Sequence, residues 1–525
     1  MDSQLNDIPS NASAIQKLSQ RNSISASNVL LVSLPWLNPI IFGPNPSVLN
    51  ALLCALCLAG IVWSPRTCQN IAVGWLCSSL LSSLIALCQL FGDSDQWGPW
   101  VSTSHGIAFA NLRQRNLFAS LTVIGLAALT YLLRRSSASL RFPSALAFLA
   151  MATLMVGNAA SASRTGLVAT GLLCLLAWQW RSSLNAGAKV TVALALPTYA
   201  LAAMVLPSLA GLTGPGWNVF SRIATGDEPC SSRLTLWSDV LYLIAQKPWF
   251  GWGWGELDYA HFVTLYQGER FCAILDNAHN LPLHLAVELG GPVALAACVV
   301  AGWLAVRSRP WAEKDPARQM AWSVIGVIGL HSLLEYPLWY GPFQMAVGLC
   351  IALLWRGNPI VADAAAPLQK SANASGMRWF FASLLMALVS YITWDYHRIS
   401  QIFLPPNQRS EVYRTDTLNK IRGSWLFQSQ VQFAELATTA LTPDNAPQVH
   451  ALALKTLHYS PEPLVVQKLI ESAVMLGRDD EALFFLQRFQ AAFPAEHKVW
   501  AAQLKLASPQ NSPTSPRASP ATSRH

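Results

Sequence analysis

Residues 276–292 read DNAHNLPLHLAVELGGP, a short polar stretch that changes into an almost unbroken apolar helical pattern. The apolar pattern continues to about residue 306, which is long enough to cross a bilayer. His279 therefore lies at the mouth of a predicted membrane span. Because imidazole titrates near neutrality, a histidine here is able to take a proton from a hydroxyl or donate one to a phosphate oxygen. A hydrogen-bonded structural histidine is the alternative interpretation.

The composition of the whole chain predicts an integral membrane protein. Of 525 residues, 52% are hydrophobic and only 12% are charged, about half the charged share of an ordinary soluble domain. We expect an all-α, polytopic membrane fold with about eleven transmembrane helices. The expected spans are 30–42, 47–63, 70–92, 117–133, 142–159, 166–180, 188–210, 281–306, 319–338, 340–355 and 379–394.

The lysines and arginines between these spans predict the orientation of the chain. They concentrate in alternate connections, which the positive-inside rule assigns to the cytoplasm. The polar N-terminus, residues 1–27, lies on the same side and shows no removable signal peptide. An odd number of spans places the C-terminal region on the periplasmic face of a bacterial inner membrane. The net charge of +8 mostly reflects this bias, so the expected contact is with the lipid bilayer and not with nucleic acid.

Several cations break this rule because they lie in connections that are predicted to be periplasmic. Arginine holds phosphate well, since its planar guanidinium offers paired donors and stays charged. We therefore expect the outer loops to converge on an anion such as a pyrophosphate, with Arg164 and Arg233 as the strongest candidates. The alternative is that these side chains reach the lipid headgroups. The cations are Arg113, Arg115, Arg164, Arg222, Arg233, Lys247 and Arg270.

Four stretches resemble the PglL family of bacterial protein O-oligosaccharyltransferases. His279 and Asn280, followed after nine residues by Gly290, resemble the signature of the wider O-antigen ligase and Wzy polymerase superfamily. The other stretches are NLRQRNLFAS at 111–120, GWGWGELDYAHF at 251–262 and HSLLEYPLWYGPF at 331–343. The first outer loop of such enzymes commonly reads Gln-Pro-Asn, whereas here Arg115 stands between Gln114 and Asn116.

This resemblance implies a GT-C-type membrane fold and a glycosyltransferase that works on the periplasmic face without a cofactor or a metal. The implied reaction transfers a preassembled glycan from undecaprenyl pyrophosphate to a serine or threonine hydroxyl of a periplasmic acceptor protein such as a pilin. Arg164 and Arg233 are then expected to stabilise the departing diphosphate and His279 to deprotonate the hydroxyl. Alternatively, His279 donates to the phosphate and the hydroxyl loses its proton late.

Further side chains are expected to border the same cavity. Trp252 and Trp254 are able to stack on sugar faces or to form part of a membrane-interface belt. The group at 331–340 holds ionisable residues at the outer end of a span, which is typical of a functional site or of a pair that locks two spans together. The candidate substrate-binding residues are Arg113, Gln114, Asn116, Asn280, Trp252, Trp254, His331, Glu335, Tyr336 and Tyr340.

Two other patterns are relevant to metal binding and to disulfide formation. The stretch DSD at 93–95 resembles the acidic pairs that hold metals in other glycosyltransferases, but a turn or helix cap explains it as well. Cys230 and Cys272 both lie in the long outer loop at about 211–280, where disulfides persist, and we expect them to pair. The alternative is two free buried thiols.

We expect a membrane domain over 28–394, a soluble helical domain over 395–506 and a disordered Ser/Pro-rich tail over 507–525. The helix, turn and helix pattern at 464–493 resembles one tetratricopeptide-like pair, in a domain that recruits the acceptor or braces the membrane part. The hydroxyl-rich tail is itself a possible glycosylation target.

Two other functions compete with protein glycosylation. The same chemistry with another acceptor makes an O-antigen ligase that acts on lipid A core, or a glycan polymerase. A lipid-linked sugar transporter is the non-enzymatic alternative, although it is expected to carry charges in the middle of its spans, which are mostly uncharged here.

Overall fold

The computed structural model of this chain describes most of its length, and helix is the only regular secondary structure in the described residues. The polar N-terminus up to residue 23, Asp93 and the tail from residue 508 lie outside these residues, so expectations placed on them are not addressed by the structure. The described residues are 24–40, 44–63, 68–92, 94–104, 106–135, 144–212, 214, 216–226, 228–355 and 372–507.

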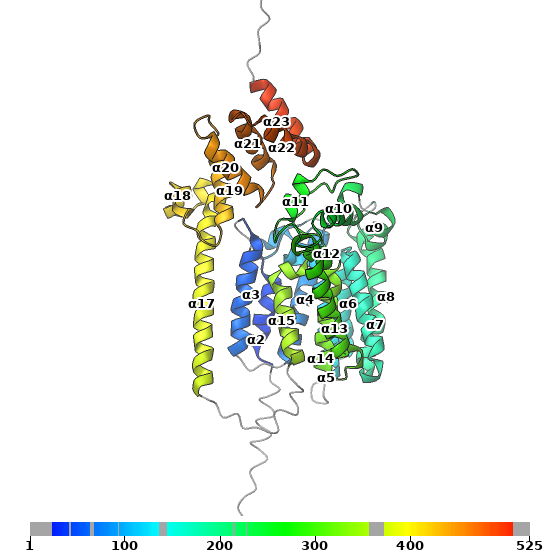
Figure 1. Cartoon of the computed structure of the whole chain (residues 1–525). Helices are drawn as coiled ribbons and strands as arrows, with labels where there is room; N and C mark the ends of the chain where they lie inside the picture. The colour runs from blue at the N-terminus through cyan, green and yellow to red at the C-terminus, as the bar shows by residue number, and fades with distance from the viewer. Residues whose placement is uncertain are drawn as a thin grey trace, which may run out of the picture.

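Most of the helices form one upright bundle, and α17 stands at its side (Figure 1). Each of the eleven expected apolar segments overlaps one of these helices. Among the described residues, four segments are by themselves long and apolar enough to cross a membrane: Cys68–Phe91, Arg115–Arg135, Ala186–Leu209 and Gly291–Ala312. The full count of eleven crossings stays a prediction. The bundle helices are α2 (Ala26–Leu37), α3 (Pro46–Trp63), α4 (Cys68–Phe91), α5 (Arg115–Arg135), α6 (Ser144–Ala160), α7 (Arg164–Gln179), α8 (Ala186–Leu209), α12 (Leu281–Leu289), α13 (Gly291–Ser308), α14 (Pro316–Ser332) and α15 (Gly341–Trp355), with α17 (Ala372–Ser400) beside them.

The centre of the bundle is α5, which packs against α4, α6, α7, α8 and α14. It is apolar on all sides, as expected for a helix that other helices surround. Small polar side chains on α4 allow a close approach to α5. The Ser79 hydroxyl of α4, for example, donates to the Leu121 carbonyl oxygen of α5 at 2.8 Å. The first turn of α5 carries Gln114 and Asn116 to one end of the bundle, so central packing positions these two side chains.

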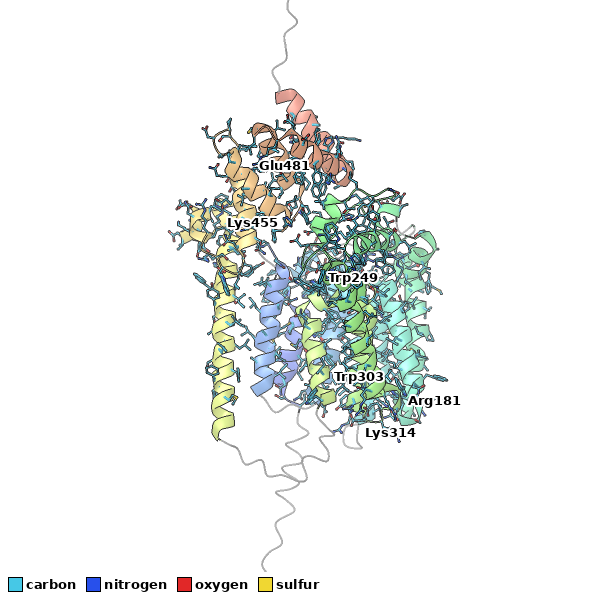
Figure 2. All side chains as sticks on the ribbon, viewed as in Figure 1. Arg181, Trp249, Trp303, Lys314, Lys455 and Glu481 are labelled. Atoms are coloured by element: carbon cyan, nitrogen blue, oxygen red, sulfur yellow. A yellow bond between two sulfur atoms is a disulfide. The ribbon has the colours of Figure 1, made fainter. Side chains whose placement is uncertain are left out.

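That same end carries the long connection between α8 and α12 (Figure 1). The connection folds into α9 (Val219–Thr225), α10 (Arg233–Gln246) and α11 (Leu257–Val263). Figure 2 shows Trp249, Lys455 and Glu481 toward this end, whereas Arg181 and Lys314 lie at the opposite end. We call the first of these the α10 end of the bundle.

The expected continuous span 281–306 is interrupted at Gly290, which separates α12 from α13. The interruption arises because the segment Pro248–Gly253 packs backbone to backbone on the end of α12. The N–H of Gly253 donates to the carbonyl oxygen of Glu288 at 3.0 Å, and the N–H of Gly291 donates to that of Pro248 at 2.8 Å. These bonds use the Glu288 carbonyl oxygen and the Gly291 N–H group, which would bond within the helix if the helix were continuous. The two glycine-containing stretches therefore form one close contact.

The expected span 319–338 is also shorter than predicted, since α14 ends at Ser332 and a short 3-10 turn, Pro337–Trp339, precedes α15. Pro337 explains the end of the helix: proline lacks an N–H group and its ring clashes with the preceding turn. Regular helix therefore ends at Ser332, and Glu335 lies in the turn that connects α14 to the 3-10 segment.

After α17 the chain forms a group of helices at the α10 end (Figure 1). The predicted helix pair at 464–493 corresponds to α21 and α22, while its assignment to a repeat class stays a prediction. Phe262 of α11 belongs to the apolar core of this group, and the Arg488 side chain donates to the Val263 carbonyl oxygen at 2.6 Å. The outer loop and the C-terminal helices are thus packed together. The group consists of α18 (Thr417–Ile421), α19 (Gln428–Thr438), α20 (Ala446–Leu457), α21 (Pro463–Met475), α22 (Asp479–Ala492) and α23 (Pro494–Ala507).

Replacement of Gly290 by alanine should lower the stability of the chain strongly. Gly290 has φ +93°, and an added Cβ would lie 2.1 Å from the carbonyl oxygen of Trp249. The left-handed backbone alone costs a non-glycine residue about 1–3 kcal/mol, and the clash adds to that. Gly302→Ala is the matched control, because nothing lies within 4 Å of the site of its added Cβ. Thermal unfolding of the purified protein measures both variants, and equal unfolding midpoints would contradict the backbone contact.

Candidate active site

Glu335 is the centre of a buried polar cluster at the α10 end of the bundle. Its side chain is nearly inaccessible to solvent. One carboxylate oxygen accepts a hydrogen bond from Nδ1 of His279 at 2.6 Å, and the other forms an ion pair with Arg233. The amide groups of Asn116 and Gln114 donate to the same carboxylate at 3.0 and 3.3 Å. Four side chains from three widely separated segments therefore meet on one carboxylate.

Each of these side chains comes from the end of a helix. Gln114 and Asn116 lie at the start of α5, and Arg233 is the first residue of α10. His279 directly precedes Asn280, the residue that caps α12. Helix starts position polar side chains at the rim of a bundle while the apolar remainder of each helix stays packed. The arrangement thus follows from where the apolar segments begin.

The environment of Glu335 keeps it ionised. Burial by itself raises the pKa of this carboxyl group, but the hydrogen bond and charge of His279, the charge of Arg233 and that of His331 together hold its pKa below the ordinary value. A buried carboxylate is stable only with such partners. Glu335 therefore acts as the anion that holds a histidine and an arginine together.

The contact with Glu335 also defines the state of His279. A carboxylate accepts the Nδ1 proton, so the neutral ring carries its free lone pair on Nε2. The backbone of His279 has φ +50°, and its N–H group donates to the Asn277 side chain at 2.9 Å. The edge of the ring meets Tyr336 with centroids 4.7 Å apart. The ring is thus held in one orientation, with Nδ1 on Glu335 and its edge on Tyr336.

Asn280 braces this arrangement. Its side-chain oxygen accepts the N–H of Leu283 at 3.0 Å, and its amide donates to the Leu333 carbonyl oxygen at 3.0 Å. The first bond caps α12, and the second ties the histidine loop to the segment that carries Glu335. The structure thus shows how Asn280 positions its neighbours, and substrate binding by this residue stays a prediction.

His331 lies one turn before Glu335 on α14 and is fully buried. Its Nδ1 atom lies 2.8 Å from the Ser120 hydroxyl of α5, and Nε2 has no hydrogen-bond partner among the described residues. The N–H of Glu335 donates to the His331 carbonyl oxygen at 2.8 Å. Farther along, Tyr336 and Tyr340 have stacked rings with centroids 6.0 Å apart. The group expected at 331–340 is therefore contiguous with the Glu335 cluster.

The arginine clusters of the outer loops occupy different places. Arg164 begins α7 directly after Ser163, whose hydroxyl donates to the side-chain oxygen of Asn116 at 2.6 Å. Arg222 donates to the carbonyl oxygen of Ala162 at 2.9 Å, and its charge acts on Arg115. The loop around Arg164 is thus linked through Asn116 to the Glu335 cluster. Among the described contacts, Arg113 instead donates to the Pro39 carbonyl oxygen at 3.2 Å and does not reach Glu335.

Three protein families match successive parts of this chain. Residues 108–133 match the family described as protein glycosylation ligase, residues 146–298 match O-antigen ligase, and residues 319–507 match the C-terminal region of virulence factor membrane-bound polymerase. Helix starts that carry the Glu335 cluster fall inside or beside these matches. Together these matches make the chain similar to PglL-type members of the O-antigen ligase and Wzy polymerase superfamily.

Curated relatives agree with this assignment. A general O-oligosaccharyltransferase of Acinetobacter baylyi is 25% identical over 350 residues, which are 64% of this chain and 58% of that protein. A ComP-specific O-oligosaccharyltransferase of the same organism is 25% identical over 272 residues, which are 51% of this chain and 48% of that protein. The chain thus spans about half to three fifths of the length of the curated relatives it matches.

Trp252 and Trp254 are the two candidates for stacking on sugars or for a membrane-interface belt. They differ in how much of each ring the protein itself covers. The indole N–H of Trp252 donates to the Leu243 carbonyl oxygen at 3.0 Å, and Lys247 covers its ring at 3.9 Å. Trp254 is 64% exposed and stacks on Trp339 with centroids 6.4 Å apart. Trp254 therefore offers an open aromatic surface, whereas Trp252 is engaged within the protein.

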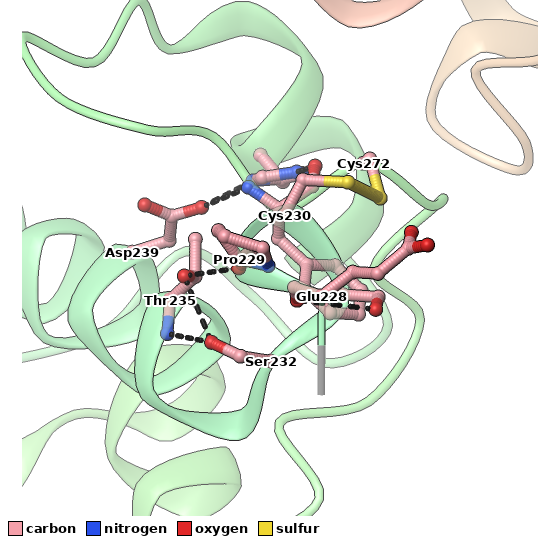
Figure 3. Close-up of a disulfide and its surroundings, with 10 residues drawn as sticks. Glu228, Pro229, Cys230, Ser232, Thr235, Asp239 and Cys272 are labelled. Atoms are coloured by element: carbon pink, nitrogen blue, oxygen red, sulfur yellow. Dashed lines mark hydrogen bonds and ion pairs between the residues drawn. A yellow bond between two sulfur atoms is a disulfide. The ribbon is translucent and has the colours of Figure 1, made fainter. Parts of the chain in front are cut away.

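A disulfide joins Cys230 to Cys272 (Figure 3). The N–H of Cys272 also donates to the carbonyl oxygen of Cys230 at 3.0 Å. Arg233 lies three residues after the first cysteine, at the start of α10. The crosslink therefore anchors the segment that delivers Arg233 to Glu335.

The stretch that was considered for metal binding is only partly described. Ser94 forms two hydrogen bonds with the backbone of Ser104, accepting at 3.0 Å and donating at 2.9 Å. These two bonds close the loop between Ser94 and Ser104. Within the described residues, no group of three or more histidine, cysteine or acidic side chains is arranged to hold a metal ion.

Sequence reasoning named the residues that meet in the Glu335 cluster, but it did not reveal which of them is the centre. Glu335 was expected only to border the cavity, whereas four other candidates converge on it. The EYPLWY stretch carried the available signal, because Glu335 lies two residues before Pro337, and a proline there marks a helix break at the membrane boundary. Arg115 and Arg222 were recognised as unusual outer cations without a place in the site.

Replacement of Glu335 by glutamine should destabilise the chain by about 1–3 kcal/mol, because it leaves Arg233 without its anion in a largely buried cluster. Glu435→Gln is the control, since it removes the partner of Arg422 in an exposed ion pair that is worth about 1 kcal/mol or less. Thermal unfolding in detergent compares the two variants. A larger loss for Glu435→Gln would show that the cluster is not a stabilising centre.

Removal of the disulfide by Cys230→Ser together with Cys272→Ser should also destabilise the chain. The cysteines are 42 residues apart, and closure of such a loop is worth on the order of 4 kcal/mol in the chain-entropy account. Reduction of the wild-type protein should lower its unfolding midpoint, and reduction of the double variant should not. A wild-type midpoint that is insensitive to reductant would contradict this expectation.

Proposed function

We propose that this chain is a protein O-oligosaccharyltransferase that transfers a preassembled glycan from undecaprenyl pyrophosphate to serine or threonine hydroxyls of a periplasmic protein such as a pilin. The observation that carries the proposal is the convergence of His279 and Arg233 on buried Glu335. The names of the curated relatives support the reaction class.

The proposed orientation places eleven spans in the bacterial inner membrane, with the α10 end in the periplasm. Arg181 and Lys314 lie at the opposite end (Figure 2), as the positive-inside rule requires of the cytoplasmic side. A disulfide lies at the α10 end, and disulfides persist in the periplasm. Both observations favour an active site on the periplasmic face.

The donor diphosphate binds among the cations at the α10 end. Arg233 uses one Nη atom for Glu335, and the remaining guanidinium donors are available to a phosphate oxygen. Arg164 lies in the loop that Ser163 links to Asn116. Arg115 and Arg222 extend the positive field on the same side. Fixed cations stabilise the charge that develops as the diphosphate departs.

The acceptor hydroxyl is activated on the other side of the Glu335 cluster. Nε2 of His279 takes the hydroxyl proton while Glu335 stabilises the imidazolium through Nδ1. The hydroxyl oxygen forms a bond to the anomeric carbon as the bond from that carbon to the phosphate oxygen breaks. Undecaprenyl pyrophosphate leaves with the electron pair, and attack from the opposite face inverts the anomeric centre. The reaction needs no nucleotide sugar.

The helices after α17 are proposed to recruit the acceptor protein. They lie at the same end as the active site, and they contact α11 directly: His458 stacks on Tyr259 with centroids 3.9 Å apart and pairs with Glu256 at 2.7 Å. A bound acceptor is thereby kept close to the outer loop. In this proposal the group over 395–506 is a soluble domain with the tetratricopeptide-like pair at its centre.

Replacement of His279 by alanine should reduce transfer about 100-fold or more, since it removes the general base. The test uses a glycosylation-deficient bacterium supplied with a lipid-linked glycan and a pilin, and it measures the intact mass of the pilin at equal membrane abundance of each variant. His397→Ala, an exposed histidine of α17, is the control and should transfer normally.

Two outcomes would contradict parts of the proposal. Equal pilin modification by wild type and His279→Ala would remove the histidine from the reaction. An unmodified pilin together with altered lipopolysaccharide or free polymer would move the acceptor to lipid A core or to glycan, as the O-antigen ligase match would then suggest.

A further inference from the structure

A groove of about 430 Å³ lies beside the disulfide, between α10 and the segment Tyr266–Glu269. This volume is within the range of small-molecule sites, about 300–1,000 Å³. The lining residues are Leu234, Thr235, Ser238, Asp239, Tyr242, Tyr266, Gln267, Gly268 and Glu269. None of them belongs to the Glu335 cluster, so the groove is separate from the reacting centre.

The groove lies along α10, the same helix that begins with Arg233 of the Glu335 cluster. Its α10 residues are spaced three and four apart and form one stripe of that helix, about 10 Å long from Thr235 to Tyr242. Arg233 begins the same helix and extends to Glu335 from another face. A ligand in the groove is therefore farther from His279 than the reacting sugar, but it remains connected to the site around the start of α10.

The walls of the groove are fixed before any ligand binds. Asp239 accepts the N–H of Phe271 at 2.9 Å, next to the crosslinked Cys272 (Figure 3). The Tyr266 hydroxyl lies 2.8 Å from Nδ1 of His261, and Nε2 of that histidine lies 3.1 Å from the Phe271 carbonyl oxygen. A carbonyl only accepts, so Nε2 donates to it and the tyrosine hydroxyl donates to Nδ1. Such pre-ordering reduces the entropy cost of binding.

The chemistry of the lining is that of a carbohydrate site. Tyr242 is 44% exposed and offers a ring face, while Arg270 already covers Tyr266 at 5.4 Å. The remaining groups are short hydroxyls, the amide of Gln267 and the carboxylate of Glu269. Sugars present apolar C–H faces to aromatic rings and hydroxyl edges to such polar groups. Among the described residues that line the groove there is no lysine or arginine, which disfavours acidic sugars.

An extended polypeptide fits this groove less well. One wall is a helix and the other is a non-helical loop without strand geometry, so neither presents a free sheet edge for an added strand. Leu234 is the one aliphatic side chain in the lining, which leaves no apolar pocket for an anchoring residue.

We propose that this groove binds uncharged or amine-bearing sugars of the donor glycan that lie several residues beyond the transferred bond. The assignment rests on the proposed transferase function and deepens it, because it makes glycan length and charge determinants of donor affinity. Tyr242 supplies the stacking surface, and Gln267 and Glu269 supply hydrogen bonds to the sugar edges.

The test measures transfer kinetics of the full chain with two undecaprenyl pyrophosphate donors, one carrying a single neutral sugar and the other a chain of four or more neutral sugars. Tyr242→Ala should raise KM about 10-fold for the long donor and leave KM for the short donor and for the acceptor unchanged. Gln267→Ala, an exposed position, should act in the same direction more weakly. Leu241→Ala is the control, since this residue of α10 is 54% exposed and lies outside the lining.

A long-donor KM that stays unchanged in both Tyr242→Ala and Gln267→Ala would overturn the assignment. A rise confined to the KM of the acceptor would also overturn it and would assign the groove to polypeptide. Equal rises for both donors would indicate general disturbance of α10 and count against it as well. Absence of transfer by the wild type with either donor is a different result, because it would reject the transferase function itself.

Discussion

The buried negative charge of Glu335 is the constraint on which the site depends. A carboxylate without solvent requires donors, and here a histidine, an arginine and two amides supply them from three separate segments. The same contacts keep the carboxyl group ionised and fix Nδ1 of His279 as the ring nitrogen that donates to Glu335. One residue thereby joins the central helix α5 to the outer loop and to the break after α14.

Backbone contacts and a disulfide hold in place the segments that supply His279 and Arg233 to this cluster. The glycine-containing stretches around Gly251 and Gly290 approach so closely that an added Cβ would lie 2.4 Å or less from a backbone atom. This contact divides the predicted span into α12 and α13 and so limits α12, the helix that directly follows His279 and Asn280, to Leu281–Leu289. The disulfide anchors the start of α10 in a comparable way. Rigid support of this kind suits a site that must stabilise charge without reorganisation.

The distribution of groups around the cluster supports a division of tasks. Cations gather in the loops of α5, α7 and α9, where a diphosphate would be held in the proposed reaction, whereas the C-terminal helices that are proposed to bring an acceptor contact α11 of the outer loop. The groove along α10 is acidic and aromatic, in contrast to the basic side, and this difference separates a place for sugars from a place for phosphate. Exposed Trp254 and Trp339 add an aromatic surface near the same rim.

Apolar composition and period determined the helical class and the approximate places of the helices, because each long apolar segment must bury its backbone polar groups within a helix in a membrane. Motif residues were sufficient to indicate the superfamily, and the shared outer loop indicated the cysteine pair. The sequence alone did not reveal Glu335 as the centre, the break at Gly290 or the groove on α10. Those features depend on contacts between segments that are separated by tens to hundreds of residues, and helical periodicity carries no information about which helix ends meet. Only tertiary packing decided that Asn116, Arg233 and His279 share one carboxylate.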